Sequence, residues 1–240
     1  MKLNFTPTRG FWVLLASFCV IAAFNPVLAW PPKAGFASAV PTRIQPYLMT
    51  SQDEEVSLAR SAAPPSVSSG ATVMTLGTRG YITAVKGRNG FVCLVERSWA
   101  NATDAKSAQF WNPKFRAPYC FNAAGARSVL PRYLSRTKWV LAGASQSEIG
   151  QRVDAAWTAG KFEEPALGAM CYMMSKRGLL NYGGPWRPHL MFFFSRSSEE
   201  PNWGANRPGS PVFVRARTHT VTYMVLVPIW SDGTRAPNDQ

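Results

Sequence analysis

Glycine-rich turns separate three runs of β-branched and aromatic residues in the part of the chain that follows residue 70. The runs cover residues 71–76, 81–86 and 91–98. Such runs are typical of strands, because branched and aromatic side chains pack well on a pleated surface. The Asn89-Gly90 pair between the second and third runs favours a two-residue hairpin turn. The pattern therefore predicts a meander of three antiparallel strands.

Two helices are expected to follow the meander. An apolar stripe predicts the first, over about residues 128–143, with Arg132 and Arg136 pointing away from the stripe. A capping-box pattern, Ser145 with Glu148, starts the second helix, which runs to a glycine near residue 160. The stripe of the first helix consists of Leu130, Tyr133, Leu134, Thr137 and Leu141.

The last third of the chain returns to strand-like patterns. Residues 168–175, 189–195 and 220–229 are rich in β-forming side chains, and residues 211–215 form a weaker candidate. Strands, then a pair of helices, then three or four further strands is the order of an α+β fold. The simplest assembly is one antiparallel sheet with the helices covering one face.

The N-terminus has the pattern of a secretory signal peptide. Lys2 and Arg9 precede an uncharged apolar run at residues 11–24, which is too short to span a bilayer. An Asn-Pro pair interrupts the run, and Val-Leu-Ala then offers a peptidase site before Trp30. We therefore expect residues 1–29 to be removed, leaving an exported protein, periplasmic or extracellular, with no stable membrane span.

The segment between the signal peptide and the strands divides into two parts. Residues 30–50 contain four prolines and few charges, so an extended arm or linker is expected there. Ser51 and Glu54 form a second capping-box pattern, which predicts a short helix to about residue 62. Residues 51–240 are then expected to form a single α+β domain.

The chain is strongly basic. Its formal net charge is +13, and 24 basic residues remain against 13 acidic ones when Lys2 and Arg9 are removed with the signal peptide. An excess of this size favours anionic partners, such as envelope polymers or a small polar ligand. The basic residues are spread from Arg60 to Arg235 without a charge run, so no nucleic-acid partner is expected.

Three cysteines, Cys93, Cys120 and Cys171, remain after cleavage. The odd count allows at most one internal disulfide, and the pairing stays open at this stage. Apolar neighbours around each cysteine also fit buried, unreactive thiols. No CxxC or HxxxH spacing is present, so we expect no metal site and no cofactor.

A histidine and one loop supply the candidate ligand-binding residues. His189 opens a predicted strand directly after a loop rich in glycine and proline, a position from which a side chain can reach a site. Trp203, Asn206, Arg207 and Ser210 lie together in a second tight loop. They combine a stacking face, an amide, a guanidinium and a hydroxyl, which suits a polar or sugar-like ligand.

A hydrolase with a cysteine nucleophile is the catalytic alternative. Cys120 lies just ahead of a helical region whose dipole can lower the pKa of a thiol, and His189 would serve as the base. Such chemistry requires the two side chains to lie within hydrogen-bonding distance. A serine hydrolase is not favoured, because no GxSxG motif is present.

Four segments carry a resemblance to a known family. FVCLVERSW at 91–99, GAMCYMMS at 168–175, PHLMFF at 188–193 and WGANRPGSP at 203–211 resemble an uncharacterised family of exported bacterial proteins. The resemblance covers the chain from about Val56 and implies export and a single domain. It implies no activity, cofactor or site residue.

The sequence therefore favours an exported soluble protein that acts as a non-catalytic binding module. Its expected ligand is a small polar molecule or an anionic component of the cell envelope. A hydrolase with a Cys/His pair and a structural or assembly factor of the envelope are the two alternatives. Catalytic patterns are absent from the sequence, and this absence is what favours binding.

Overall fold

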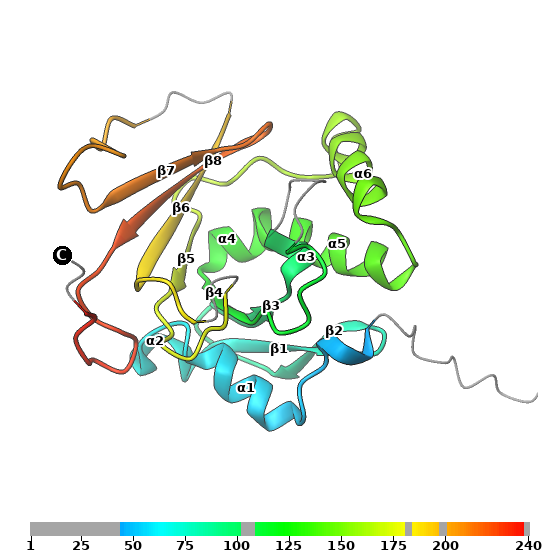
Figure 1. Ribbon diagram of the computed structural model, residues 1–240, viewed down its shortest axis with the longest axis horizontal. Helices are drawn as coiled ribbons and strands as arrows, with labels where there is room; N and C mark the ends of the chain where they lie inside the picture. Colours follow the sequence, from blue (N-terminus) through cyan, green and yellow to red (C-terminus); the bar gives the residue numbers. More distant parts are fainter. Residues whose placement is uncertain (1–43, 102–108, 181–183, 197–200, 238–240) are drawn as a thin grey trace, which may run out of the picture. The chain divides into compact units, whose positions relative to one another are not determined.

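The structure is a computed structural model that describes residues 44–101, 109–180, 184–196 and 201–237 (Figure 1). It contains one sheet of eight strands in the order β2-β1-β3-β4-β5-β6-β8-β7. All neighbouring strands run antiparallel except β1 and β3. The predicted α+β class is confirmed. The strands are β1 (Thr72–Gly77), β2 (Gly80–Val85), β3 (Val92–Glu96), β4 (Ala117–Phe121), β5 (Met170–Met173), β6 (His189–Ser195), β7 (Val212–Ala216) and β8 (Thr220–Leu226).

Among the described residues, the three longest helices fall where local signals predict them, and four short helical segments are additions. Ser51 accepts a hydrogen bond from the Glu54 backbone N–H at 3.1 Å at the start of α1, and the capping box of Ser145 and Glu148 opens α6. The prediction missed the short segments η1, α2, α3 and α4. The helical segments are η1 (Gln45–Tyr47), α1 (Gln52–Arg60), α2 (Pro65–Ser68), α3 (Ser98–Asn101), α4 (Ala123–Ser128), α5 (Leu130–Leu141) and α6 (Gln146–Thr158).

The predicted three-strand meander is wrong. β1 and β2 form a hairpin, but β3 pairs with β1, in parallel, so β2 lies at the edge of the sheet. The connection from β2 to β3 crosses the start of β1, where Gly87 packs so closely that a Cβ would lie 2.1 Å from the Thr72 nitrogen. Asn89 donates to the Val67 carbonyl at 2.7 Å, so it anchors this crossing and does not form a hairpin turn.

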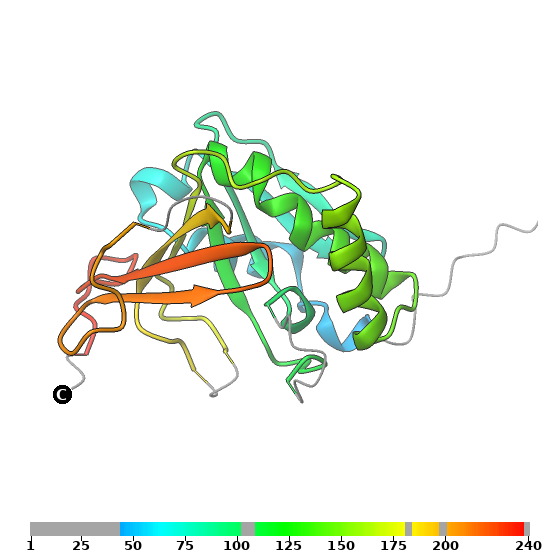
Figure 2. The same cartoon turned by 90° about the horizontal axis from the view of Figure 1, so that it is seen from above.

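Helices cover both faces of the sheet, which corrects the expected one-sided arrangement. α1 packs on the face of β3 that carries Cys93 and Val95, whereas α4 and α5 cover the face that carries Leu94. Figures 1 and 2 show these helices on opposite sides of the strands. All five residues of β4 are buried, and a strand buried on both faces needs a layer on each side.

The packed unit begins before residue 51. Ile44 and Tyr47, which fall in the expected arm, are 1% and 5% exposed. The Tyr47 hydroxyl donates to the Trp111 carbonyl at 2.8 Å, and its ring packs edge-on against Trp99. The C-terminal part of the arm therefore contributes to the core. The expected signal peptide and residues 30–43 lie outside the described residues.

A buried ion pair fastens α1 to the end of β3. The Arg97 guanidinium donates to Glu55 at 2.9 Å, and the two side chains are 0% and 3% exposed. Arg97 also donates to the backbone carbonyls of Tyr47 and Val95, while Glu55 accepts from the Leu76 backbone N–H. The pair thus links η1, α1, β1 and β3.

No helix in the described part of the chain is long and apolar enough to span a membrane.

Candidate functional site

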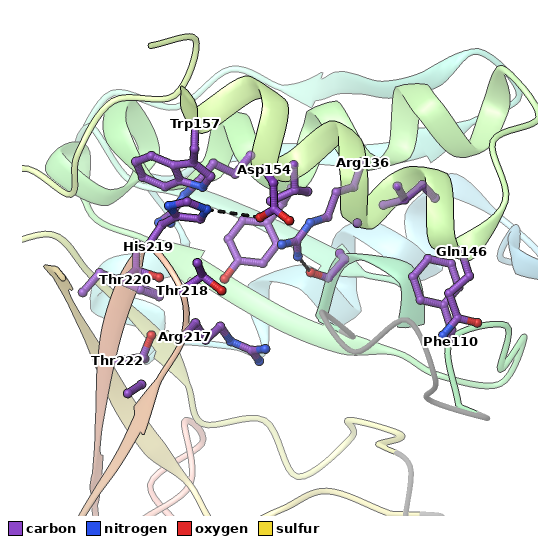
Figure 3. Close-up of a pocket in the computed structure, with 18 residues that line it drawn as sticks. Phe110, Arg136, Gln146, Asp154, Trp157, Arg217, Thr218, His219, Thr220 and Thr222 are labelled. Carbon is purple, nitrogen blue, oxygen red and sulfur yellow. Dashed lines mark hydrogen bonds and ion pairs between the residues drawn. The ribbon is translucent and has the colours of Figure 1, made fainter. Parts of the chain in front are cut away.

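The strongest candidate site lies between helices α5 and α6 and the inner face of strands β6 and β8. Side chains alternate along a strand, so Phe193 of β6 and its partner Thr222 of β8 both face the helices. A cavity of about 290 Å³ opens between these layers (Figure 3). The turn between β7 and β8 forms its outer rim, with Arg217 and His219 in the wall.

Three arginines line this cavity. Arg132 and Arg136 come from one face of α5, four residues apart, and Arg217 comes from the turn between β7 and β8. Figure 3 shows Arg136 and Arg217 reaching the cavity from its helical and strand walls. Arg136 donates to the Ala100 carbonyl, and the Arg132 guanidinium lies 5.3 Å from the centre of the Trp157 ring. Positive charge is therefore concentrated inside a partly enclosed space.

Burial acts on all three guanidinium groups. Loss of hydration lowers the pKa of Arg136 to about 10 and also lowers the pKa of Arg132 and of Arg217. Arg136 remains charged near neutral pH, because its pKa stays well above 7. Arg132 and Arg217 also remain charged, since arginine side chains titrate far above neutrality. The cavity thus holds three guanidinium groups that have lost part of their hydration, and this loss costs free energy.

A histidine and an aspartate meet at the rim of the cavity. His219 Nε2 lies 3.2 Å from Asp154 Oδ1, and the imidazole stacks on Trp157 with ring centres 5.0 Å apart (Figure 3). Asp154 is the one carboxylate among the described residues that line the cavity. Its interaction with His219 ties α6 to the turn between β7 and β8, so it holds the two walls together.

A second carboxyl group lies behind the cavity wall. Glu96 ends β3 on the face that α5 covers, and neither of its oxygens has a hydrogen-bond partner among the described residues. Burial raises the pKa of Glu96 well above its usual range, although the Arg136 charge acts in the opposite direction. The neutral carboxyl is therefore favoured, and it adds little negative charge near the arginines.

A second cavity, of about 430 Å³, adjoins the first. The two cavities share four lining residues: Tyr133, Phe193, Arg217 and Thr222. His189 lies in the wall of the second cavity, 2% exposed, with Nδ1 2.7 Å from the Arg187 carbonyl. Burial lowers the pKa of His189 to about 4, so its imidazole is neutral at physiological pH.

The loop predicted to bind a ligand is divided: Asn206, Arg207 and Ser210 line one groove, whereas Trp203 lies apart from them. Trp203 is 40% exposed and packs against Phe192, Phe194 and Tyr223, on the face of the sheet opposite His189. Asn206 lines the second cavity, so it is the one residue of this loop that the structure brings to the same cavity as His189.

Asn206 also has a structural role at the edge of the sheet. Its backbone N–H donates to the Val212 carbonyl at 2.9 Å, and its side-chain oxygen accepts from the Val214 N–H at 3.2 Å. Its φ of 58° is of the kind that asparagine tolerates best after glycine. Asn206 also lines a groove beside the second cavity, together with Arg207 and Ser210.

The predicted pair of Cys120 and His189 is not formed. Cys120 is bonded to Cys93 across β3 and β4, so it has no thiol to act as a nucleophile. The strand register pairs Cys120 with Tyr172 and Tyr172 with Leu190, which places Cys120 on the face of the sheet opposite His189. Separation of the two side chains by the sheet excludes direct proton transfer between them.

The structure also shows the environment of the third cysteine, Cys171, and how the potential metal ligands are distributed. Cys171 is free and buried, and desolvation raises the pKa of its thiol well above the usual range, which disfavours a reactive thiolate. Among the described residues, no group of three or more histidine, cysteine or acidic side chains lies close enough to hold a metal ion.

Most of the residues that line the first cavity could not be identified from the sequence. Arg132 and Arg136 were predicted on the outer side of α5, because local patterns could not locate β7 and β8 beside that helix. The spacing of four residues between two arginines on an amphipathic helix is the one available signal. Comparison with protein-family models, curated proteins and solved structures found no match, so the geometry alone supports this site.

Proposed function

We propose that the chain is an exported binding protein whose first cavity takes a small polar ligand with negative charge. One observation carries the proposal. Arg132, Arg136 and Arg217 line a cavity in which Asp154, the one carboxylate among the described lining residues, interacts with His219. Three guanidinium groups and a single carboxylate among the described lining residues favour a ligand with negative charge.

The energetics of buried charge support an anion. A guanidinium that is partly removed from water loses hydration, and an opposite charge nearby compensates for that loss. Arginine also offers a planar fork of donors that matches carboxylate and phosphate oxygens. Thr218, Thr220 and Thr222 line the same cavity and add hydroxyl groups that can donate to the ligand (Figure 3).

Export is part of the proposal and rests on two features. The first is the signal-peptide pattern of residues 1–29. The second is the disulfide between Cys93 and Cys120, since such bonds persist mainly outside the reducing cytoplasm. We therefore propose a periplasmic or extracellular location, where a free small anion or an anionic envelope component would be the source of the ligand.

Thermal unfolding with simple anions tests the proposal. Protein recovered from expressing cells would be heated with inorganic phosphate, sulfate or citrate at low ionic strength. A bound anion at a hundred times its Kd stabilises by about 2.7 kcal/mol, which raises Tm by roughly 5–10 °C for a domain of this size. At least one anion is expected to give such a shift, and added sodium chloride should reduce it.

Matched variants locate the binding. Arg136→Gln and Arg217→Gln each remove one charge from the cavity, and each is expected to weaken binding about tenfold or more, because a hydrogen bond to a charged group contributes about 1.5–3 kcal/mol. Arg127→Gln on α4 is the control, since Arg127 is exposed and does not line the cavity. Equal anion effects in all three variants, or no stabilisation of the wild type, would refute the proposal.

A further inference from the structure

The second cavity indicates what else the ligand contains. Resting on the proposed function, we infer that the ligand is an amphipathic anion, with its charged group between Arg136 and Arg217 and an apolar chain or ring in the second cavity. The inference depends on the continuity of the two cavities and on the change from threonine to methionine side chains along β8.

Continuity follows from the strands that form the floor of both cavities. Thr220 of β8 lines the first cavity, Thr222 lines both, and Met224 lines the second. These three residues lie on one face of β8, since they are two positions apart. The distance from Thr220 to Met224 along the strand is about 14 Å at a rise of about 3.4 Å per residue. A single elongated molecule can therefore contact both cavities.

β6 lies beside β8 and contributes apolar side chains to the floor. Phe193, the partner of Thr222, lines both cavities, whereas Met191, the partner of Met224, lines only the second. β6 thus presents apolar side chains to both cavities, and the change from threonine to methionine belongs to β8. A molecule lying along this face would have its polar end near the turn between β7 and β8 and its apolar end toward the start of β6.

The wall of the second cavity suits an apolar group of variable shape. Three methionines contribute to it, and their unbranched, polarizable side chains adapt to irregular partners. His189 adds a neutral ring, and no carboxylate is present among the described lining residues. Arg215 also lines this cavity, on the side that Arg217 shares with the first cavity. The apolar residues of the wall outside the shared set are Phe115, Met173, Leu180, Trp186, Met191, Phe213, Val214 and Met224.

A series of straight-chain carboxylates tests the inference. Butanoate, hexanoate, octanoate and decanoate would be titrated calorimetrically into the whole protein below their micelle-forming concentrations, with inorganic phosphate as the anion that has no apolar part. Affinity is expected to rise about three- to fourfold for each methylene group that enters the cavity. Octanol, which has the chain without the charge, should bind far more weakly than octanoate.

Variants separate the two ends of the site. Met224→Gln is expected to flatten the dependence on chain length while leaving phosphate binding unchanged, and Arg136→Gln should weaken every carboxylate by a similar factor. Phe213→Ser is a second variant of the apolar wall, on the edge strand β7, in case Met224→Gln unfolds the protein. Leu167→Gln is the control, because Leu167 is fully exposed and lines neither cavity.

The outcomes distinguish the inference from the proposal on which it rests. Phosphate binding that requires Arg136, together with equal affinity for butanoate and decanoate, would overturn the inference and leave the proposed function standing. No binding of any anion would overturn both. A chain-length effect that survives both Met224→Gln and Phe213→Ser would show nonspecific adsorption and would also overturn the inference.

Discussion

Removal of one partner from the buried pair of Glu55 and Arg97 should destabilise the protein severely. Glu55→Leu leaves the Arg97 charge buried with backbone carbonyls as its remaining partners. Arg97→Met leaves the Glu55 carboxylate with the Leu76 N–H. An uncompensated charge at a site that is 0–3% exposed costs about 3–5 kcal/mol. Each single variant should therefore lose that amount of unfolding free energy.

The double variant is the informative one. Glu55→Leu with Arg97→Met replaces both charges by apolar groups of similar size, and replacement of a whole buried pair is often neutral or stabilising. The double variant should therefore be more stable than either single variant. Guanidinium denaturation followed by tryptophan fluorescence measures all three free energies. A double variant whose loss equals the sum of the single losses would refute the coupling between the two side chains.

A control comes from an exposed ion pair. Lys176 contacts Asp232 near the C-terminus, and these side chains are 50% and 41% exposed. Water screens such a pair, so Lys176→Gln should leave the denaturation midpoint almost unchanged. The contrast tests whether burial, and not the mere presence of opposite charges, sets the size of the effect.

Three further predictions concern the core. Replacement of Cys93 and Cys120 by alanine should cost about 3–4 kcal/mol in urea denaturation, from the 27-residue separation of the bonded pair, and an unchanged midpoint would contradict this. His189 has a folded pKa of about 4, below its usual 6.5, so the protein should lose on the order of 3 kcal/mol as pH falls through that window. Calorimetry should find this loss absent in His189→Gln. The raised pKa of Glu96 has the opposite sign, so stability should fall above pH 4.5 as the unfolded state ionises. Glu96→Gln should therefore gain stability over the wild type with rising pH, by up to about 1.4 kcal/mol per unit, and a gain independent of pH would argue against a buried neutral acid.

Local signals predicted the elements that depend on neighbouring residues. The capping box of Ser145 and Glu148 forms as expected, and the helix that follows has the predicted length. β6 coincides with the run that begins at His189. These features depend on hydrogen bonds and side-chain periods within a few residues, so one sequence contains enough information to predict them.

Pairing between distant strands could not be predicted in the same way. Asn89-Gly90 has the sequence of a hairpin turn, but the side chain of Asn89 binds the Val67 carbonyl and the chain crosses to the far side of β1. The disulfide depends on the same long-range arrangement, since Cys93 and Cys120 are direct partners across β3 and β4. Three cysteines with apolar neighbours offered no means of choosing that pair.

The candidate site depends on long-range contacts even more strongly. Arg217 follows Arg136 by 81 positions in the sequence. The two line one cavity because β8 pairs with β6, which places the turn between β7 and β8 beside α5. The tight loop at Trp203 had a more suggestive composition, yet Asn206 uses its hydrogen bonds to hold the edge of β7. Composition identified residues able to bind a ligand, but it could not show which of them share a cavity.

A crystal structure of the protein with the anion that raises Tm most tests the central claim directly. We predict density for the anion between Arg136 and Arg217, within hydrogen-bonding distance of their guanidinium groups and beside Thr218. For an amphipathic anion, the apolar part should extend along β8 toward Met224. Density for the anion at another surface, with the first cavity holding only solvent, would contradict the account.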